Sequence, residues 1–200
     1  MRIFVAIVPP PAVVAELDDR TAWLRATWPG LRWTGPEAWH ITLAFLADVA
    51  EQALPDLSVR LERAARRHPA QDLAVRGAGA FPGASNAQVL WAGIDGDRGG
   101  LRALAASVAA GARRAGAPSP DEGRRYRPHI TLARLREPAD VRPLTSDLAT
   151  LATSRWTAAR IELIRSHSPG PAPGSRPRYE LLAHWPLSQP RRPPTRDARG

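Results

Sequence analysis

The sequence contains one near-repeat whose residues could do chemistry. The segment HITLAFL, residues 40–46, returns about ninety residues later as HITLARL, residues 129–135, with six of seven positions identical. Imidazole titrates near pH 6.5, so one histidine can accept a proton while another, protonated, donates one. The threonine hydroxyls can donate hydrogen bonds to phosphate oxygens. The repeat therefore predicts acid–base chemistry at a phosphorus centre.

The repeat is predicted to form strands. Side chains alternate along a strand, so His40 and Thr42 share one face while Ile41 and Leu43 face the core. The same alternation holds in the second copy. If the two strands lie near a pseudo-twofold axis, two histidines and two threonines converge on one groove. Displacement at phosphorus runs in line, so acid and base must stand on opposite sides, as two related lobes would place them.

The only difference inside the repeat is that Phe45 is replaced by Arg134. Alternation points both side chains away from the histidines, so Arg134 could clamp a phosphate only if the strand end twists. Its alternative role is solvation of that strand end. Arg127 and Tyr126 precede His129 and could also reach a substrate. Among the tryptophans, Trp39 or Trp33 could stack on a base.

No metal or other cofactor is expected. The chain has no cysteine and five histidines, and the three outside the repeat, His68, His167 and His184, lack a threonine two residues on. No HExxH spacing or acidic cluster accompanies them.

The flanking sequence predicts an α+β fold with strands and helices interspersed. Strands are expected at residues 2–8, 39–46, 72–81, 87–94, 129–135, 156–166 and 178–186. Helices are expected at residues 12–28, 51–68, 101–115 and 141–152. The duplicated strand–helix unit predicts a bilobal molecule, with two antiparallel sheets flanking a central groove and helices outside.

Composition limits the function classes. The chain has 200 residues, and its net charge of +9 comes from arginine alone, since lysine is absent. This charge favours a polyanionic partner. The opening MRIFVAIVPP is too short for a signal peptide or membrane span, so a cytoplasmic protein without membrane association is expected. Residues 1–187 are expected to form one bilobal domain and residues 188–200 a disordered basic tail.

These segments resemble a known family. Paired H-x-T-x motifs at this separation are similar to the 2H phosphoesterase superfamily, and particularly to its bacterial RNA 2',3'-cyclic phosphodiesterases, historically called 2'-5' RNA ligases. The resemblance extends over about residues 1–187 and includes the segments RIFVAI, RWTGPEAWHITLAFL, VLWAGI and RPHITLARL.

The resemblance implies metal-free hydrolysis of a terminal 2',3'-cyclic phosphate to a 2'-phosphate. It implies that His40 protonates the departing 3'-oxygen, that His129 activates water, and that Thr42 and Thr131 hold phosphate oxygens. The expected partners are RNA ends, or a nucleotide with a 2',3'-cyclic phosphate, bound by a monomer. The alternatives are a relative acting on a small cyclic nucleotide or a 2'-5' linked oligonucleotide, and a non-catalytic RNA- or nucleotide-binding module.

Overall fold

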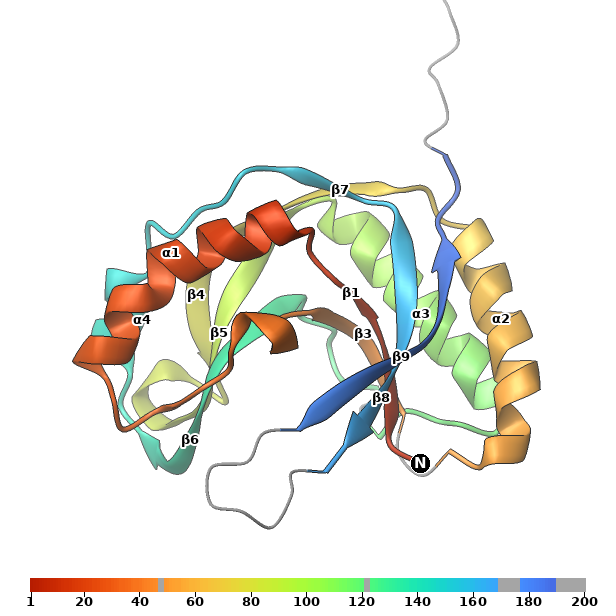
Figure 1. Cartoon of the computed structure of the whole chain (residues 1–200), viewed down its shortest axis with the longest axis horizontal. Helices are drawn as coiled ribbons and strands as arrows, with labels where there is room; N and C mark the ends of the chain where they lie inside the picture. Colours follow the sequence, from red (N-terminus) through yellow and green to blue (C-terminus); the bar gives the residue numbers. More distant parts are fainter. Residues whose placement is uncertain (47–48, 121–122, 169–176, 190–200) are drawn as a thin grey trace, which may run out of the picture.

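Two antiparallel sheets form the centre of the molecule, with α-helices outside them (Figure 1). The computed structural model describes residues 1–46, 49–120, 123–168 and 177–189. Sheet A has the strand order β3-β1-β8-β9, and sheet B has the order β2-β6-β5-β4-β7. The strands are β1 (Ile3–Ile7), β2 (Arg32–Trp33), β3 (Ile41–Leu46), β4 (Gln71–Phe81), β5 (Ala87–Gly96), β6 (His129–Ala139), β7 (Trp156–Ala158), β8 (Arg160–His167) and β9 (Arg178–Pro186). The predicted α+β fold with two antiparallel sheets is confirmed.

Helices α1 (Pro11–Thr27) and α3 (Arg98–Arg114) each follow a strand of one sheet and cover the other sheet. Helix α1 follows β1 of sheet A but lies over β4 and β5 of sheet B (Figure 1). Helix α3 follows β5 of sheet B but packs against β3 of sheet A. Helix α2 (Leu54–Arg66) lies beside α3, and α4 (Arg142–Asp147) is a single short helix. Each sheet is therefore covered by a helix that directly follows a strand of the other sheet.

One continuous apolar core joins both sheets and the helices. In β1, the fully buried Ile3, Val5 and Ile7 contribute to that core. Phe4 and Ala6 face the other side of sheet A, where they form a small separate cluster with residues of the neighbouring strands. Alternation in one strand thus gives sheet A an inner face available for a site.

Two predicted elements differ most from the structure. The single strand expected at residues 156–166 is two strands in different sheets: β7 pairs with β4 and β8 pairs with β1. The chain changes sheets at Ala159, a step that an uninterrupted run of strand-forming residues does not reveal. The helix expected at residues 141–152 ends at Asp147, because Leu148 and Leu151 are buried in an irregular segment that reaches β4.

The C-terminal end of the described chain is attached to the fold. Ser188, expected in the tail, donates its N–H to the His68 carbonyl and accepts the Ala70 N–H. Residues 190–200, the rest of the predicted tail, lie outside the described residues. Among the described helices, none is long and apolar enough to cross a membrane.

Candidate active site

His40 lies directly before β3 at the edge of sheet A, with its ring over the inner face of that sheet. The ring stacks on Phe4, with 4.5 Å between centroids and 26° between planes. Tyr179 of β9 meets the same ring edge-on at 5.5 Å. These two aromatic rings hold the imidazole in a half-buried position.

His129 begins β6 in sheet B and has a matching aromatic environment. Phe81 lies edge-on at 5.0 Å between centroids, and Trp91 lies at 6.1 Å. The Nδ1 atom of His129 is 2.7 Å from the Arg127 carbonyl. Because a carbonyl can only accept, Nδ1 carries the proton in the neutral ring, and Nε2 keeps a lone pair for chemistry.

A β-bulge follows each His-x-Thr segment. Along β1 and β3, Val5 pairs with Ala44 whereas the next residue, Ala6, pairs with Thr42, so Leu43 is an extra residue. Along β5 and β6, Leu90 pairs with Ala133 and Trp91 with Thr131, so Leu132 is extra. The same position is therefore bulged in both copies of the repeat.

The bulges correct the prediction made from strict alternation. An extra residue shifts the alternation of side chains by one position. Leu132 and Ala133 are consecutive buried residues, and the following Arg134 returns to the face that carries His129. Phe45 returns in the same way beside Phe4 on the inner face of sheet A. Arg134 therefore points toward the histidines, not away from them.

The electrostatics of the histidines agree with that placement. Burial lowers the pKa of His40 to about 4; a hydrogen bond to the Ala38 backbone opposes the shift, and the charges of His129 and Arg134 add to it. Burial also lowers the pKa of His129, with a further contribution from Arg134. The guanidinium of Arg134 thus acts on both rings, one in each sheet, and the lowered pKa values favour the neutral form of both rings in the ligand-free protein.

Both threonines of the repeat are half-buried on the histidine faces of their strands. Within the described residues, no hydrogen bond engages the hydroxyl of Thr42 or Thr131. The hydroxyls can therefore donate to a ligand without breaking an internal bond.

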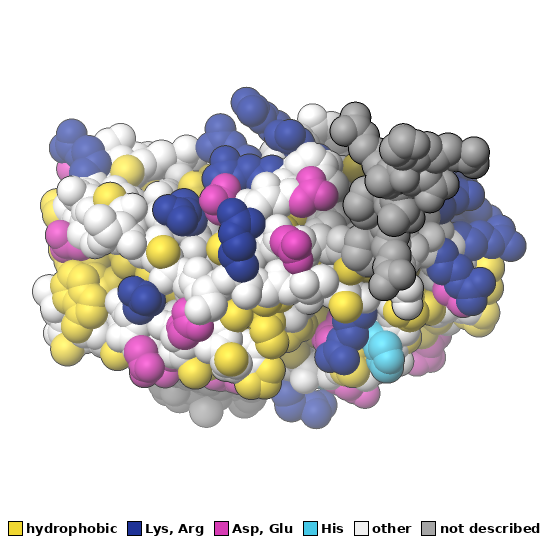
Figure 2. Space-filling model, turned by 90° about the horizontal axis from the view of Figure 1, so that it is seen from above, with side chains coloured by type: hydrophobic (Ala, Val, Ile, Leu, Met, Phe, Trp, Pro, Cys, Tyr) yellow, Lys and Arg dark blue, Asp and Glu magenta, His cyan; other side chains and the backbone are white. Residues whose placement is uncertain are grey.

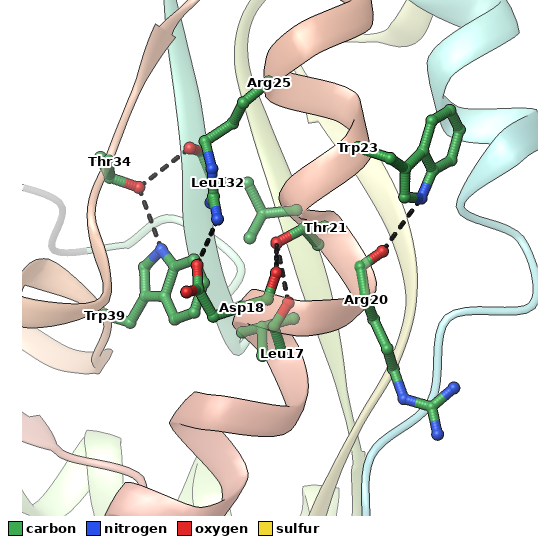
Figure 3. Close-up of polar contacts among 9 residues, drawn as sticks. All are labelled: Leu17, Asp18, Arg20, Thr21, Trp23, Arg25, Thr34, Trp39 and Leu132. Atoms are coloured by element: carbon green, nitrogen blue, oxygen red, sulfur yellow. Dashed lines mark hydrogen bonds and ion pairs between the residues drawn. The ribbon is translucent and has the colours of Figure 1, made fainter.

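Two reciprocal contacts tie the repeats together. The Tyr126 hydroxyl, which precedes the second repeat, donates to the Thr42 carbonyl of the first at 3.1 Å. The hydroxyl of Thr34, a residue that precedes the first repeat, lies 2.6 Å from the Thr131 carbonyl of the second repeat. It also lies 2.9 Å from the Leu132 carbonyl, a contact drawn in Figure 3. It donates to this bulged pair, whose regular ladder is interrupted.

Trp39 completes the second contact and is not placed to stack on a base. Its side chain is buried, 3% exposed, and its Nε1 donates to the Thr34 hydroxyl at 3.2 Å (Figure 3). Trp33 packs against the core and donates to the Trp28 carbonyl. Arg127 is exposed, and the contact it makes with the site is through its backbone carbonyl.

Four aromatic residues around the histidines were missed by sequence reasoning: Phe4, Tyr179, Phe81 and Trp91. The sequence could have predicted the position of Phe4, because alternation in β1 places its side chain on the opposite face of the strand from the core residues Ile3 and Val5. The other three lie on strands whose pairing partners the sequence does not specify. In the described part of the chain, no group of three or more His, Asp or Glu side chains could hold a metal ion.

Comparisons with known proteins agree with this geometry. The sequence profile of the 2'-5' RNA ligase superfamily matches residues 9–170. A Thermus thermophilus protein named RNA 2',3'-cyclic phosphodiesterase is 30% identical over 170 residues, which are 83% of this chain and 82% of the relative. A protein of the same name from Aeropyrum pernix is 30% identical over 64% of this chain and 71% of its own length.

Solved structures share the fold. A crystal structure of a Thermus thermophilus protein superposes with a TM-score of 0.76 at 29% identity, covering 94% of this chain and 99% of the other. A crystal structure of E. coli LigT complexed with 3'-AMP superposes with a TM-score of 0.72 at 26% identity, covering 94% and 98%. The profile match and these relatives agree with the paired His-x-Thr strands, and together they show that the chain belongs to the 2'-5' RNA ligase superfamily.

Proposed function

We propose that the protein is an RNA 2',3'-cyclic phosphodiesterase, a hydrolase that opens a terminal 2',3'-cyclic phosphate to a 2'-phosphate. The observation that carries the proposal is the convergence of His40, His129 and Arg134 from two bulged repeats. Two proton carriers and one fixed positive charge are what hydrolysis of a cyclic phosphodiester requires. The names of the relatives supply the substrate class.

In this mechanism, His129 takes a proton from water as the water oxygen attacks phosphorus. Its Nδ1–H is held by the Arg127 carbonyl, which leaves Nε2 as the acceptor. The bond from phosphorus to the 3'-oxygen breaks, and His40 gives that oxygen a proton. The product carries a 2'-phosphate and a 3'-hydroxyl, so one water is consumed and both histidines have exchanged protonation states.

The lowered pKa of His40 suits a proton donor, because a buried imidazolium gives up its proton more readily than a solvated one. It must first be protonated, and the negative charge of a bound phosphodiester favours that state. Arg134 and the hydroxyls of Thr42 and Thr131 would hold the non-bridging oxygens, where charge accumulates in the transition state. Arg127 could add a second, more exposed charge.

Phe4, Tyr179, Phe81 and Trp91 pack around the histidines, so these rings would exclude much of the bulk water from the reacting phosphate. Exclusion of water strengthens each electrostatic contact there. An RNA substrate also favours the cytoplasmic location expected from the sequence.

A substrate comparison tests the proposal. We expect kcat/KM to be highest for an oligoribonucleotide ending in a 2',3'-cyclic phosphate, and lower for a mononucleotide 2',3'-cyclic phosphate or a 2'-5' linked dinucleotide. A preference for either small substrate would favour the alternative assignment within the superfamily. Binding of all three without turnover would favour a non-catalytic module.

A further inference from the structure

A groove of about 330 Å³ lies between α2 and α3. The two helices cover the outer face of sheet A (Figure 1). Small residues, among them Ala64, Ala110 and Gly111, form the floor of the groove, and the arginines Arg60, Arg63, Arg67 and Arg114 line it.

The helices run antiparallel and close together at this groove. His68, just after α2, lies 2.7 Å through Nε2 from the hydroxyl of Ser107 in the middle of α3. Near the other end, a Cβ added at Gly111 would lie 3.5 Å from Arg60. Because the floor is built of small side chains, the long arginine side chains must lie along its edges.

Helical spacing brings the arginines to the groove together. Arg60, Arg63 and Arg67 are separated by three and four residues, so they share one face of α2. Arg114 follows Ser107 by seven residues and Gly111 by three, which places it on the groove face of α3. Arg63 and Arg114 lie in the last turns of their helices, where positive charge is stabilised by the helix dipole. The helix dipole explains positive charge in these turns, but it does not explain why arginines of both helices line the same groove.

The groove has more positive charge than its neighbours neutralise. Arg60 forms an ion pair with Asp56 at 2.7 Å. Within the described ranges, no carboxylate forms an ion pair with Arg63, Arg67 or Arg114, and all three are exposed. Arg67 also lowers the pKa of His68, after burial, which keeps that ring neutral. Figure 2 shows arginine side chains grouped at the end of the molecule where α2 lies.

We propose that this groove binds the phosphodiester backbone of RNA at nucleotides remote from the reacting end. Guanidinium forks match phosphate oxygens in geometry and charge. The proposal rests on the proposed function, which supplies RNA as the substrate. A strand whose end occupies the catalytic site reaches the groove only by passing an edge of sheet A, so long RNA engages both sites and a dinucleotide engages one.

The test is binding of a labelled single-stranded RNA, measured by fluorescence anisotropy over a range of salt concentrations. The RNA ends in a 3'-hydroxyl, so binding is measured without turnover. A triple variant, Arg63→Gln, Arg67→Gln and Arg114→Gln, removes three phosphate contacts. At about 0.7 per contact, its plot of log affinity against log salt should be shallower by about 2. Each single variant should lose about a third of that change.

The matched control is Arg20→Gln, Arg76→Gln and Arg155→Gln, which removes three exposed arginines that lie outside the groove and outside α2 and α3. The control should keep the wild-type slope. Equal slopes for the two triple variants would overturn the proposal and leave the groove arginines a role at the helix ends only. Turnover of a dinucleotide ending in a 2',3'-cyclic phosphate is measured separately and should be the same in all three proteins. Absence of that turnover in the wild type would refute the proposed function without bearing on the slopes.

Discussion

His40 and His129 have similar surroundings as well as similar sequence positions. Each ring packs against aromatic residues of its own sheet, and burial lowers the pKa of each, which favours its neutral form in the free protein. Their different protonation roles in the proposed reaction must therefore arise when the substrate binds. A bound phosphate would favour the protonated form of a ring beside it, and Arg134 opposes protonation of both rings.

Replacing either histidine should remove most turnover. We expect His40→Ala and His129→Ala each to lower kcat by about 10²–10⁴-fold, the usual contribution of a general acid or base. The double variant should be little slower than the worse single variant, since one concerted step uses both rings. His167→Ala, at the far end of β8, is the control and should keep wild-type kcat. A near wild-type rate in either site variant would remove that histidine from the mechanism.

Arg134 should set the pH profile. Its charge lowers the pKa of both histidines, so Arg134→Gln should raise both values and move both limbs of the kcat/KM profile toward higher pH. NMR titration of the two rings reports the same shift directly, and Arg155→Gln should leave both rings unchanged. Unchanged histidine titrations in Arg134→Gln would show that the guanidinium does not face the site.

The threonine hydroxyls should have smaller effects than the histidines. Thr42→Val and Thr131→Val each remove one hydrogen bond to a phosphate oxygen and keep the side-chain shape. We expect losses in kcat of at most about 10²–10³-fold, the range for one oxyanion donor. If the double valine variant kept wild-type kcat and KM, the hydroxyls would serve the strands alone.

At the scale of elements, the β-bulges decide which side chains meet. The sequence was sufficient to predict that His40 and Thr42 lie opposite Ile41 and Leu43, because two-residue periodicity is local. It was insufficient to predict which face of the strand the Arg134 side chain occupies, because a bulge depends on the pairing with the neighbouring strand. The change of sheet at Ala159 was hidden for the same reason.

The Thr34 hydroxyl should stabilise the second bulge. Thr34→Val removes its donor to the Thr131 and Leu132 carbonyls and the acceptor of Trp39 Nε1. We expect a loss of about 1–3 kcal/mol in the free energy of unfolding, since the Trp39 Nε1 loses its acceptor and the Thr131 carbonyl loses this donor, whereas the Leu132 carbonyl keeps the Thr34 backbone N–H. Because Thr131 and Arg134 flank the bulge, kcat should fall as well. Thr27→Val, at the exposed end of α1, is the control in chemical denaturation, and an equal effect there would argue against the bracing role.

At the scale of the whole molecule, the exchange of α1 and α3 between lobes explains why the two sheets share one core. The repeat in the sequence predicted two related lobes. It did not predict that each sheet is covered by a helix that follows a strand of the other sheet, since a helix that faces either sheet has the same apolar spacing.

Net charge belongs to this scale too. If the substrate is an RNA end, log KM should rise with log salt, by about 0.7 per phosphate contacted. Deleting residues 189–200 removes Arg191, Arg192, Arg196 and Arg199. We expect this truncation to raise KM modestly for long RNA and to leave kcat on a dinucleotide unchanged. Equal, shallow salt dependence for long RNA and a mononucleotide would favour a small-nucleotide substrate.

The central claim is hydrolysis of a cyclic phosphate by the paired histidines without a metal. Its most direct test is incubation of the purified protein, in excess EDTA, with an RNA that ends in a 2',3'-cyclic phosphate, followed by identification of the new end group. We predict complete conversion to a 2'-phosphate at an undiminished rate. A 3'-phosphate product, or loss of turnover in EDTA that returns when a divalent metal is added, would contradict the account.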